Sequence, residues 1–338
     1  SSEIQNYYLK PENVESWEVG LEGKFFKSRL NFDVAYYHSE TTDQIITVPI
    51  DQAVGATSVV VNAGCVRNRG VEISARFQPV KTKDFEWTIN ANWSKNWNKL
   101  VELSDGVAMW NLNPNITVGG NIYIRAYPGT ELGRLYGRGY ERAPEGAFYV
   151  DADGSYVDCS NQIVVDAQTG SARLTSTEAE LLDLGSIYPD WTAGMSHAFS
   201  YKGFRLGMSF SAQWGGRTYS MTHFALAYQG KLKNSLKGRY AGMIVPGVNL
   251  NENGTYSKNT TITTDIVDHY TNYVYARENA EENVFDTSFL KLKELRLEYS
   301  LPRHLCTKTR VFQGITIGVY ATNLFCWTNF PLYDPEAG

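Results

Sequence analysis

The chain has 338 residues and a formal net charge of −5, with 43% hydrophobic and 20% charged residues. Nucleic acid is not an expected partner, because its recognition needs clustered Lys and Arg facing phosphates and the sequence has no basic stripe. A helical membrane protein is also excluded, since no run approaches the roughly 20 apolar residues of a spanning helix. The 22 Tyr, 15 Phe and 8 Trp make up 13% of the chain, which is typical of transmembrane barrels with aromatic girdles at both bilayer interfaces.

Segments in which apolar and polar residues alternate predict eight β-strands. In chain order they cover 17–25, 30–37, 71–77, 85–93, 191–199, 204–214, 295–299 and 315–319. Two weaker candidates at 44–48 and 122–136 bring the expected number to about ten. One apolar set should form a lipid-facing wall that includes Leu21, Val34, Ile73, Ile89 and Met208. Gly70 stands just before an alternating run, as expected for a bend or bulge at a barrel rim.

Short and long connections alternate along the chain. The links at 26–29, 78–84, 200–203 and 301–313 are short, whereas those at 39–64, 96–189 and 215–286 are long. In an up-and-down barrel this rhythm puts every short turn at one rim and every long loop at the other. Outer-membrane barrels have this arrangement, with periplasmic turns and extracellular loops. A soluble sandwich would share the alternation but gives no reason for the parity. The prediction is therefore an all-β, transmembrane antiparallel β-barrel with long extracellular loops.

Aromatic residues gather where the predicted strands end. Phe25, Phe26, Phe199 and Tyr201 stand beside tight turns, and Trp97, Trp191 and Trp214 stand where strands meet long loops. We therefore expect one aromatic girdle at the periplasmic rim and another at the outer rim.

The residues that usually mark an enzyme do not form a constellation. The five His are scattered, and HExxH, GxSxG and Walker motifs are absent from the sequence. Three carboxylates at Asp151, Asp153 and Asp158 resemble the start of a calcium loop, but Gln162 stands where its Glu is expected, so a hairpin turn at Asp153-Gly154 is favoured. The four Cys form no CxxC pair; a Cys65–Cys159 disulfide stays an alternative to free thiols. We expect no catalytic residue, cofactor or metal.

Aromatic and basic residues in the long loops are the only candidates for substrate binding. Rings that are exposed can stack on sugars or pack against peptides. The candidates are Trp110, Tyr136, Arg138, Tyr140, Tyr219 and His223. The alternative is that these rings only pack the loops together or meet a partner.

Five stretches, in order along the chain, resemble the SusC/RagA family of TonB-dependent transporters. They are LKPE at 9–12 with SWEVG at 16–20, GCVRNRGVE at 64–72, YPDWTAG at 188–194, FLKLKELRL at 289–297, and TNLFCWT at 322–328 with DPE at 334–336. The resemblance implies that residues 1–338 are the C-terminal part of a barrel of about 22 strands. The family's plug domain has no counterpart in the chain, and its final strand is also missing.

The same resemblance implies a function and a location. The chain would take part in TonB-dependent import of an oligomeric nutrient, a glycan or a peptide, across the outer membrane of a Gram-negative bacterium. The expected partners are outer-membrane lipid, a SusD-like surface lipoprotein, and the TonB-ExbB-ExbD complex, which would act through the missing plug. Two alternatives stay open: a passive porin, and a soluble glycan-binding β domain.

Overall fold

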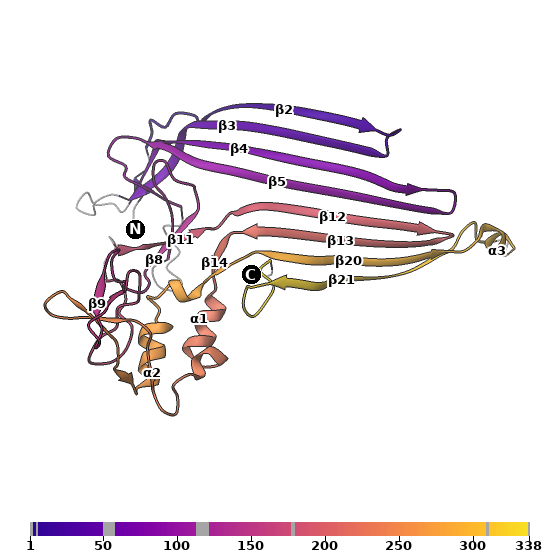
Figure 1. Ribbon diagram of the computed structural model, residues 1–338. Coiled ribbons are helices and arrows are strands. Elements are labelled where there is room, and N and C mark those ends of the chain that lie inside the picture. The colour runs from indigo at the N-terminus through magenta and orange to yellow at the C-terminus, as the bar shows by residue number, and fades with distance from the viewer. Residues whose placement is uncertain are drawn as a thin grey trace.

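The computed structural model describes residues 3–4, 6–49, 58–112, 122–176, 180–308 and 311–336. Its dominant feature is one curved antiparallel sheet of eight long strands (Figure 1). The strands are β2 (Asn13–Phe25), β3 (Leu30–Pro49), β4 (Ser58–Lys81), β5 (Phe85–Leu103), β12 (Pro189–Tyr201), β13 (Phe204–Gly215), β20 (Phe289–Ser300) and β21 (Thr316–Thr328). They follow one another in chain order across the sheet, and β1 (Glu3–Ile4) adds a short parallel pairing to β4. All eight firmly predicted strands are confirmed.

The two weaker strand predictions are confirmed only in part. Residues 44–48 are in a strand, as predicted, but they form the outer end of β3 and not a separate strand. Residues 122–136 contain β7 (Tyr123–Ala126) and reach into β8 (Arg134–Gly137), but these strands form a small separate sheet. The connection predicted at 39–64 was too long, because β3 and β4 continue pairing as far as Pro49 and Ser58.

The sheet has one apolar and one polar face, as the alternation predicts. Pairing places Leu21, Val34 and Ile73 side by side on one face. On that face Leu21 is 64% exposed and Ile73 38%. Ile89 and Met208 lie on the same face, since both pair with His197 from opposite sides. Exposed aliphatic side chains on a sheet wall are stable against lipid and costly against water, so this face is the lipid-facing wall.

The connections also confirm the predicted parity. The turns at 26–29, 82–84 and 202–203 lie at one end of the sheet, together with α3 (Arg303–Thr307) in the last short link. The long excursions 104–188 and 216–288 leave from the opposite end and fold against each other (Figure 1). Among the described residues no helix has the length and apolar character needed to cross a membrane.

The two long excursions carry their own small elements. The first contains β6 (Trp110–Asn111), β7, β8, β9 (Phe148–Val150), β10 (Tyr156–Asp158) and β11 (Leu182–Ser186). The second contains β14 (Arg217–Tyr219), α1 (Met221–Tyr228), η3 (Lys233–Leu236), β15 (Met243–Ile244), β16 (Val248–Leu250), β17 (Tyr256–Lys258), β18 (Ile262–Thr263), α2 (Ile266–Asp268), η4 (His269–Val274), η5 (Glu281–Asn283) and β19 (Val284–Asp286). We call this double-loop unit the outer cap.

Most of the buried apolar core lies in the outer cap. Tyr140 and Val165 of the first excursion pack with Val245 of the second. Cys159 likewise packs with Val248 across the same boundary. A barrel wall needs no apolar core on its polar face. Loops of this length must bury apolar side chains to offset the conformational entropy lost when they adopt a single fold. The two excursions are therefore a single packed body.

Three local predictions can be compared with the structure. The hairpin at Asp153-Gly154 is confirmed: β9 and β10 pair antiparallel, and Gly154 has a φ of +85°. Cys65 and Cys159 are free thiols. The bulge predicted at Gly70 was wrong, because the register is regular there. Gly70 instead leaves room for a ring, since a Cβ at this position would lie 2.3 Å from the Tyr37 hydroxyl oxygen.

Candidate functional site: the polar wall and the outer cap

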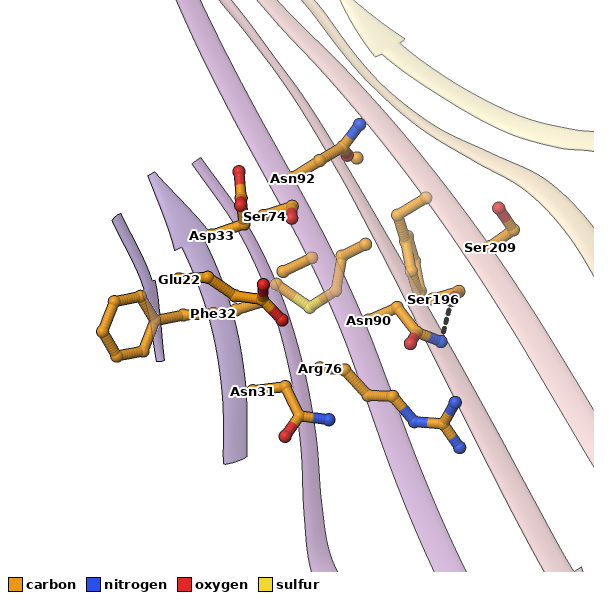
Figure 2. Close-up of a pocket in the computed structure, with 15 residues that line it drawn as sticks. Glu22, Asn31, Phe32, Asp33, Ser74, Arg76, Asn90, Asn92, Ser196 and Ser209 are labelled. Carbon is orange, nitrogen blue, oxygen red and sulfur yellow. Dashed lines mark hydrogen bonds between the residues drawn. The ribbon is translucent and has the colours of Figure 1, made fainter. Parts of the chain in front are cut away.

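The polar face of the sheet is lined by small, amide and charged side chains. Cross-strand pairing sets Asn31, Arg76, Asn90, Ser196 and Ser209 in one row across five strands. These five residues line a hollow of about 510 Å³. The Asn90 amide nitrogen donates to the Ser196 hydroxyl at 3.3 Å, the bond drawn as a dashed line in Figure 2. The wall offers both donors and acceptors to water or to a polar solute.

A second row runs beside the first. Asp33, Ser74, Asn92, Gly194 and Ser211 follow one another across the same strands. The residues on β12 and β13 are small, so the middle of the wall is recessed, while carboxylates and a guanidinium stand at its β2–β4 side (Figure 2). Sequence reasoning noted the alternation of these residues but did not select them as a site. The signal that could have found them was the run Gly207, Ser209 and Ser211 between bulky residues.

Four of the six predicted loop residues converge on one segment of the outer cap, residues 280–284. The Arg138 carbonyl accepts from the Ala280 amide at 2.9 Å. The Tyr140 hydroxyl donates to Glu282 Oε1 at 2.8 Å. Nδ1 of His223 lies 2.9 Å from the Asn283 side-chain oxygen. Tyr219 pairs with Val284 between β14 and β19. Residues of both excursions, from about 60 to about 140 positions away in sequence, thus meet this segment at one joint, which we call the cap joint.

The other two predicted residues lie elsewhere in the cap. Trp110 packs against the cluster formed by Val66, Leu100 and Ala126, where the first excursion leaves the wall. Tyr136 stands on β8 and makes an edge contact with Tyr127, with ring centroids 5.4 Å apart. Trp110, Tyr136, Arg138 and Tyr219 are part-exposed, whereas Tyr140 and His223 are 6% and 5% exposed. Their contact with a nutrient stays a prediction.

Burial controls the ionisation of the groups at the cap joint. It raises the pKa of the Glu282 carboxyl above its ordinary range and raises that of the Tyr140 hydroxyl as well. Burial also raises the pKa of Tyr219 to about 12. Its hydroxyl oxygen is buried and has no hydrogen-bond partner among the described residues. Arg142 forms an ion pair with Glu281 beside this group. Sequence reasoning missed the acidic side of the joint, because neither acidic residue belongs to a recognisable motif.

The fold and a family comparison agree. Residues 1–324 match the family model for the TonB dependent receptor-like β-barrel.

This chain belongs to the TonB-dependent receptor β-barrel family. It is therefore an outer-membrane protein of a Gram-negative bacterium, and its relatives are receptors and transporters. TonB-dependent receptor P3 of Formosa agariphila is 26% identical over 343 residues, which cover 99% of this chain and 32% of that protein. TonB-dependent receptor SusC of Bacteroides thetaiotaomicron is 22% identical over 98% of this chain and 30% of its own length.

A solved structure gives the same result at the level of the fold. The RagAB peptide importer in its closed-closed state superposes with a TM-score of 0.68 at 23% identity, over 97% of this chain and 33% of that one. The SusC/RagA resemblance is confirmed. The chain spans about a third of the length of the relatives it matches.

The Asp334-Pro335-Glu336 segment has a structural role in this TonB-dependent receptor barrel. Lys291, on the polar face of β20, is 3% exposed. Its ammonium group forms ion pairs with Asp334 at 2.6 Å and with Glu336. A buried ammonium is costly unless it is paired, so this segment neutralises the wall and fastens residues 329–336 to it.

Proposed function

We propose that this chain forms part of the wall and outer mouth of a TonB-dependent importer of an oligomeric nutrient, a glycan or a peptide. The observation that carries the proposal is the combination of a polar wall with a packed cap at its outer end, in a chain of this family. A solute would pass along hydrogen-bonding side chains on one face while lipid covers the other.

The rest of the importer would supply the energy coupling. TonB-ExbB-ExbD would act through a plug domain, and a SusD-like lipoprotein would close the mouth by resting on the outer cap. Support for a lid comes from the cap itself, because its two excursions share a core and present one preformed surface. No covalent chemistry is required of this chain; transport consists of binding, displacement of the plug and release.

Within the mouth, the part-exposed residues are our candidates for contact with the nutrient. Trp110, Tyr136 and Tyr219 could stack on it through their part-exposed rings, and Tyr136 and Arg138 could hydrogen-bond to it. Tyr140 and His223 would act on the nutrient through the shape of the cap, since their polar atoms are already engaged by Glu282 and Asn283.

The test is uptake by cells that lack the gene and are complemented with the full-length protein. Labelled oligosaccharides and oligopeptides of defined length are supplied separately, with and without functional TonB. We expect one class to be imported only when both the gene and TonB are present. Import that continues without TonB would refute the proposal and favour a passive porin. A lipoprotein partner should co-purify with the protein in mild detergent in near-stoichiometric amount. Failure of any lipoprotein to do so would refute the lidded arrangement.

A further inference from the structure

The lipid-facing wall changes character abruptly near its outer end. On β4 the lipid-facing side chains Val71, Ile73, Ala75 and Phe77 are apolar. The next two positions on the same face toward the outer rim, Arg69 and Arg67, are basic. On β2 the apolar band runs from Phe25 at the periplasmic end to Trp17 at the outer end. It covers nine residues, close to the roughly 9–11 residues that a tilted strand needs to span a bilayer. Trp17 pairs with His38, which pairs with Arg69, so this row lies at the outer boundary of the hydrocarbon.

Three basic side chains surround one ring at this boundary. Trp97 pairs directly with Arg69, while Lys95 and Lys99 precede and follow it by two residues on the same face of β5. The Lys95 ammonium lies 5.1 Å from the centroid of the Trp97 ring. The backbone of Lys95 lies one row closer to the membrane centre than that of Trp97. Its side chain therefore extends along the Trp97 ring toward the level of the lipid headgroups.

These three cations have no carboxylate within ion-pair distance in the described part of the chain. The nearby Arg67 differs, since it pairs with Glu40 at 2.8 Å. Glu15 and Glu40 share the row of Arg67 and Lys99, one row outward from Arg69. Three positive charges set close together on a lipid-facing surface without ion-pair partners of their own repel one another, and an anion would relieve that repulsion. Trp and basic residues are common at membrane interfaces, but the grouping of three cations around one ring selects a phosphate in particular, because Arg and Lys donors both suit it.

An apolar hollow lies beside the basic group. Lys95 follows Ser94, which pairs with Thr192, so Trp191 is its neighbour on β12. Trp191 stacks with Trp214 at a centroid distance of 6.4 Å. These two rings, with Leu290 and Trp327, border a hollow of about 670 Å³ whose floor includes Ala212. Trp214 and Trp327 are 58% and 55% exposed. An acyl chain attached to the phosphate-bearing group would fit between these rings.

We propose that this surface binds a phosphate-bearing glycolipid of the outer leaflet, with its phosphate between Arg69, Lys95 and Lys99 and an acyl chain in the tryptophan-lined hollow. Such a lipid is the one occupant that matches both halves of the surface, charge above and hydrocarbon below. Binding there would anchor the β4–β5 side of the barrel in the outer leaflet.

The experiment compares two triple variants of the full-length protein. R69Q/K95Q/K99Q removes the proposed phosphate site, and K81Q/K83Q/K202Q removes three exposed lysines at the opposite rim. Lys202 is a matched control for Lys95, since its ammonium also lies over an aromatic ring, that of Tyr201 at 5.3 Å. Co-purifying glycolipid is counted per protein by mass spectrometry and phosphate analysis. The delipidated proteins are then titrated with lipid A, a diphosphorylated acylated disaccharide, and with its dephosphorylated form.

We expect R69Q/K95Q/K99Q to bind lipid A at least tenfold more weakly than the unmodified protein and the opposite-rim variant, because each basic residue near an anionic lipid surface contributes roughly a fivefold factor. Dephosphorylated lipid should bind all three proteins equally and weakly. Equal binding of lipid A by both triple variants would overturn the proposal, as would equal binding of the two lipids by the unmodified protein. A change in oligomeric mass without a change in bound lipid would also overturn it, in favour of a protein contact. If the triple variant fails to show the folded, heat-modifiable band, K95Q is compared with K202Q by the same titration.

Discussion

The assignment of the two faces of the wall can be tested with substitutions at adjacent residues. Ile73 and Ser74 follow each other on β4, yet Ile73 faces lipid beside Val34 and Ser74 faces the polar side beside Asp33 and Asn92. Ile73 is 38% exposed and stands near the middle of the apolar band. An Arg at the midplane of a barrel's lipid face costs about 2–4 kcal/mol. Ile73→Arg should lower the free energy of unfolding by about that amount.

Ser74→Arg introduces the same side chain one residue away and serves as the matched control. Its guanidinium would lie among polar side chains next to the Asp33 carboxylate, so we expect a change within about 0.5 kcal/mol. Val71→Arg adds a depth control: it lies in the row of Lys95 near the outer interface, where the cost falls to about 0–1 kcal/mol.

The assay is denaturant unfolding of the full-length protein in lipid vesicles, followed by the heat-modifiable shift on gels and by tryptophan fluorescence. The expected order of stability is Ser74→Arg, then Val71→Arg, then Ile73→Arg. If Ser74→Arg were the most damaging of the three, the faces would be reversed. Equal effects at all three positions would mean that β4 does not separate lipid from an aqueous lumen.

Three further predictions concern the cap joint, the C-terminal segment and Gly70. Burial raises the folded-state pKa of Glu282 above its ordinary 4.5. Its contribution to stability is therefore full below that value and is lost as pH rises through the raised pKa. The protection of residues 276–284, measured as amide exchange relative to the intrinsic rate at each pH, should fall over this window, and Glu282→Gln should abolish the pH dependence of that protection. For Asp334, burial is the largest single influence and acts to raise the pKa, but the hydrogen bonds from Lys291 and from the Glu336 backbone, together with the positive charges of both lysines nearby, outweigh it and lower the pKa. The tether should therefore weaken as pH falls. Asp334→Asn should loosen residues 329–336 by about 1–2 kcal/mol, seen as faster proteolysis there, with Asp153→Asn unchanged. Gly70→Ala should displace the Tyr37 ring and break the 3.0 Å hydrogen bond from its hydroxyl to Asn96. The free energy of unfolding should fall by about 1–3 kcal/mol. The control Gly20→Ala, where a Cβ would have its nearest neighbour at 3.7 Å, should lower it by less than half as much.

The lumenal wall and the lipid face were accessible from sequence because their signal is local. Side chains alternate with a period of two along any strand, so the run from Phe204 to Trp214 defines both faces without knowledge of its neighbours. The short turn at Lys202-Gly203 likewise makes the pairing of β12 with β13 predictable. The eight strands and the parity of their connections follow from these features alone.

Strand length was less accessible where it depends on a partner. Beyond residue 41 the β3–β4 pairing passes through register shifts, and these break the alternation on which the prediction relied. The two strands continue to Pro49 and Ser58 because each supplies the other's hydrogen bonds. A single sequence window cannot reveal such mutual support.

The amino-acid sequence by itself determined the family, the eight-stranded wall and which side chains meet lipid, since each rests on short-range patterns. Only the tertiary structure decided how the outer cap is built. Tyr140 and Glu282 are about 140 positions apart, and their hydrogen bond depends on two excursions packing into one body. Such contacts have no period in the sequence. The basic group around Trp97 combines both levels: alternation puts Lys95 and Lys99 on one face, and strand pairing brings Arg69 to them.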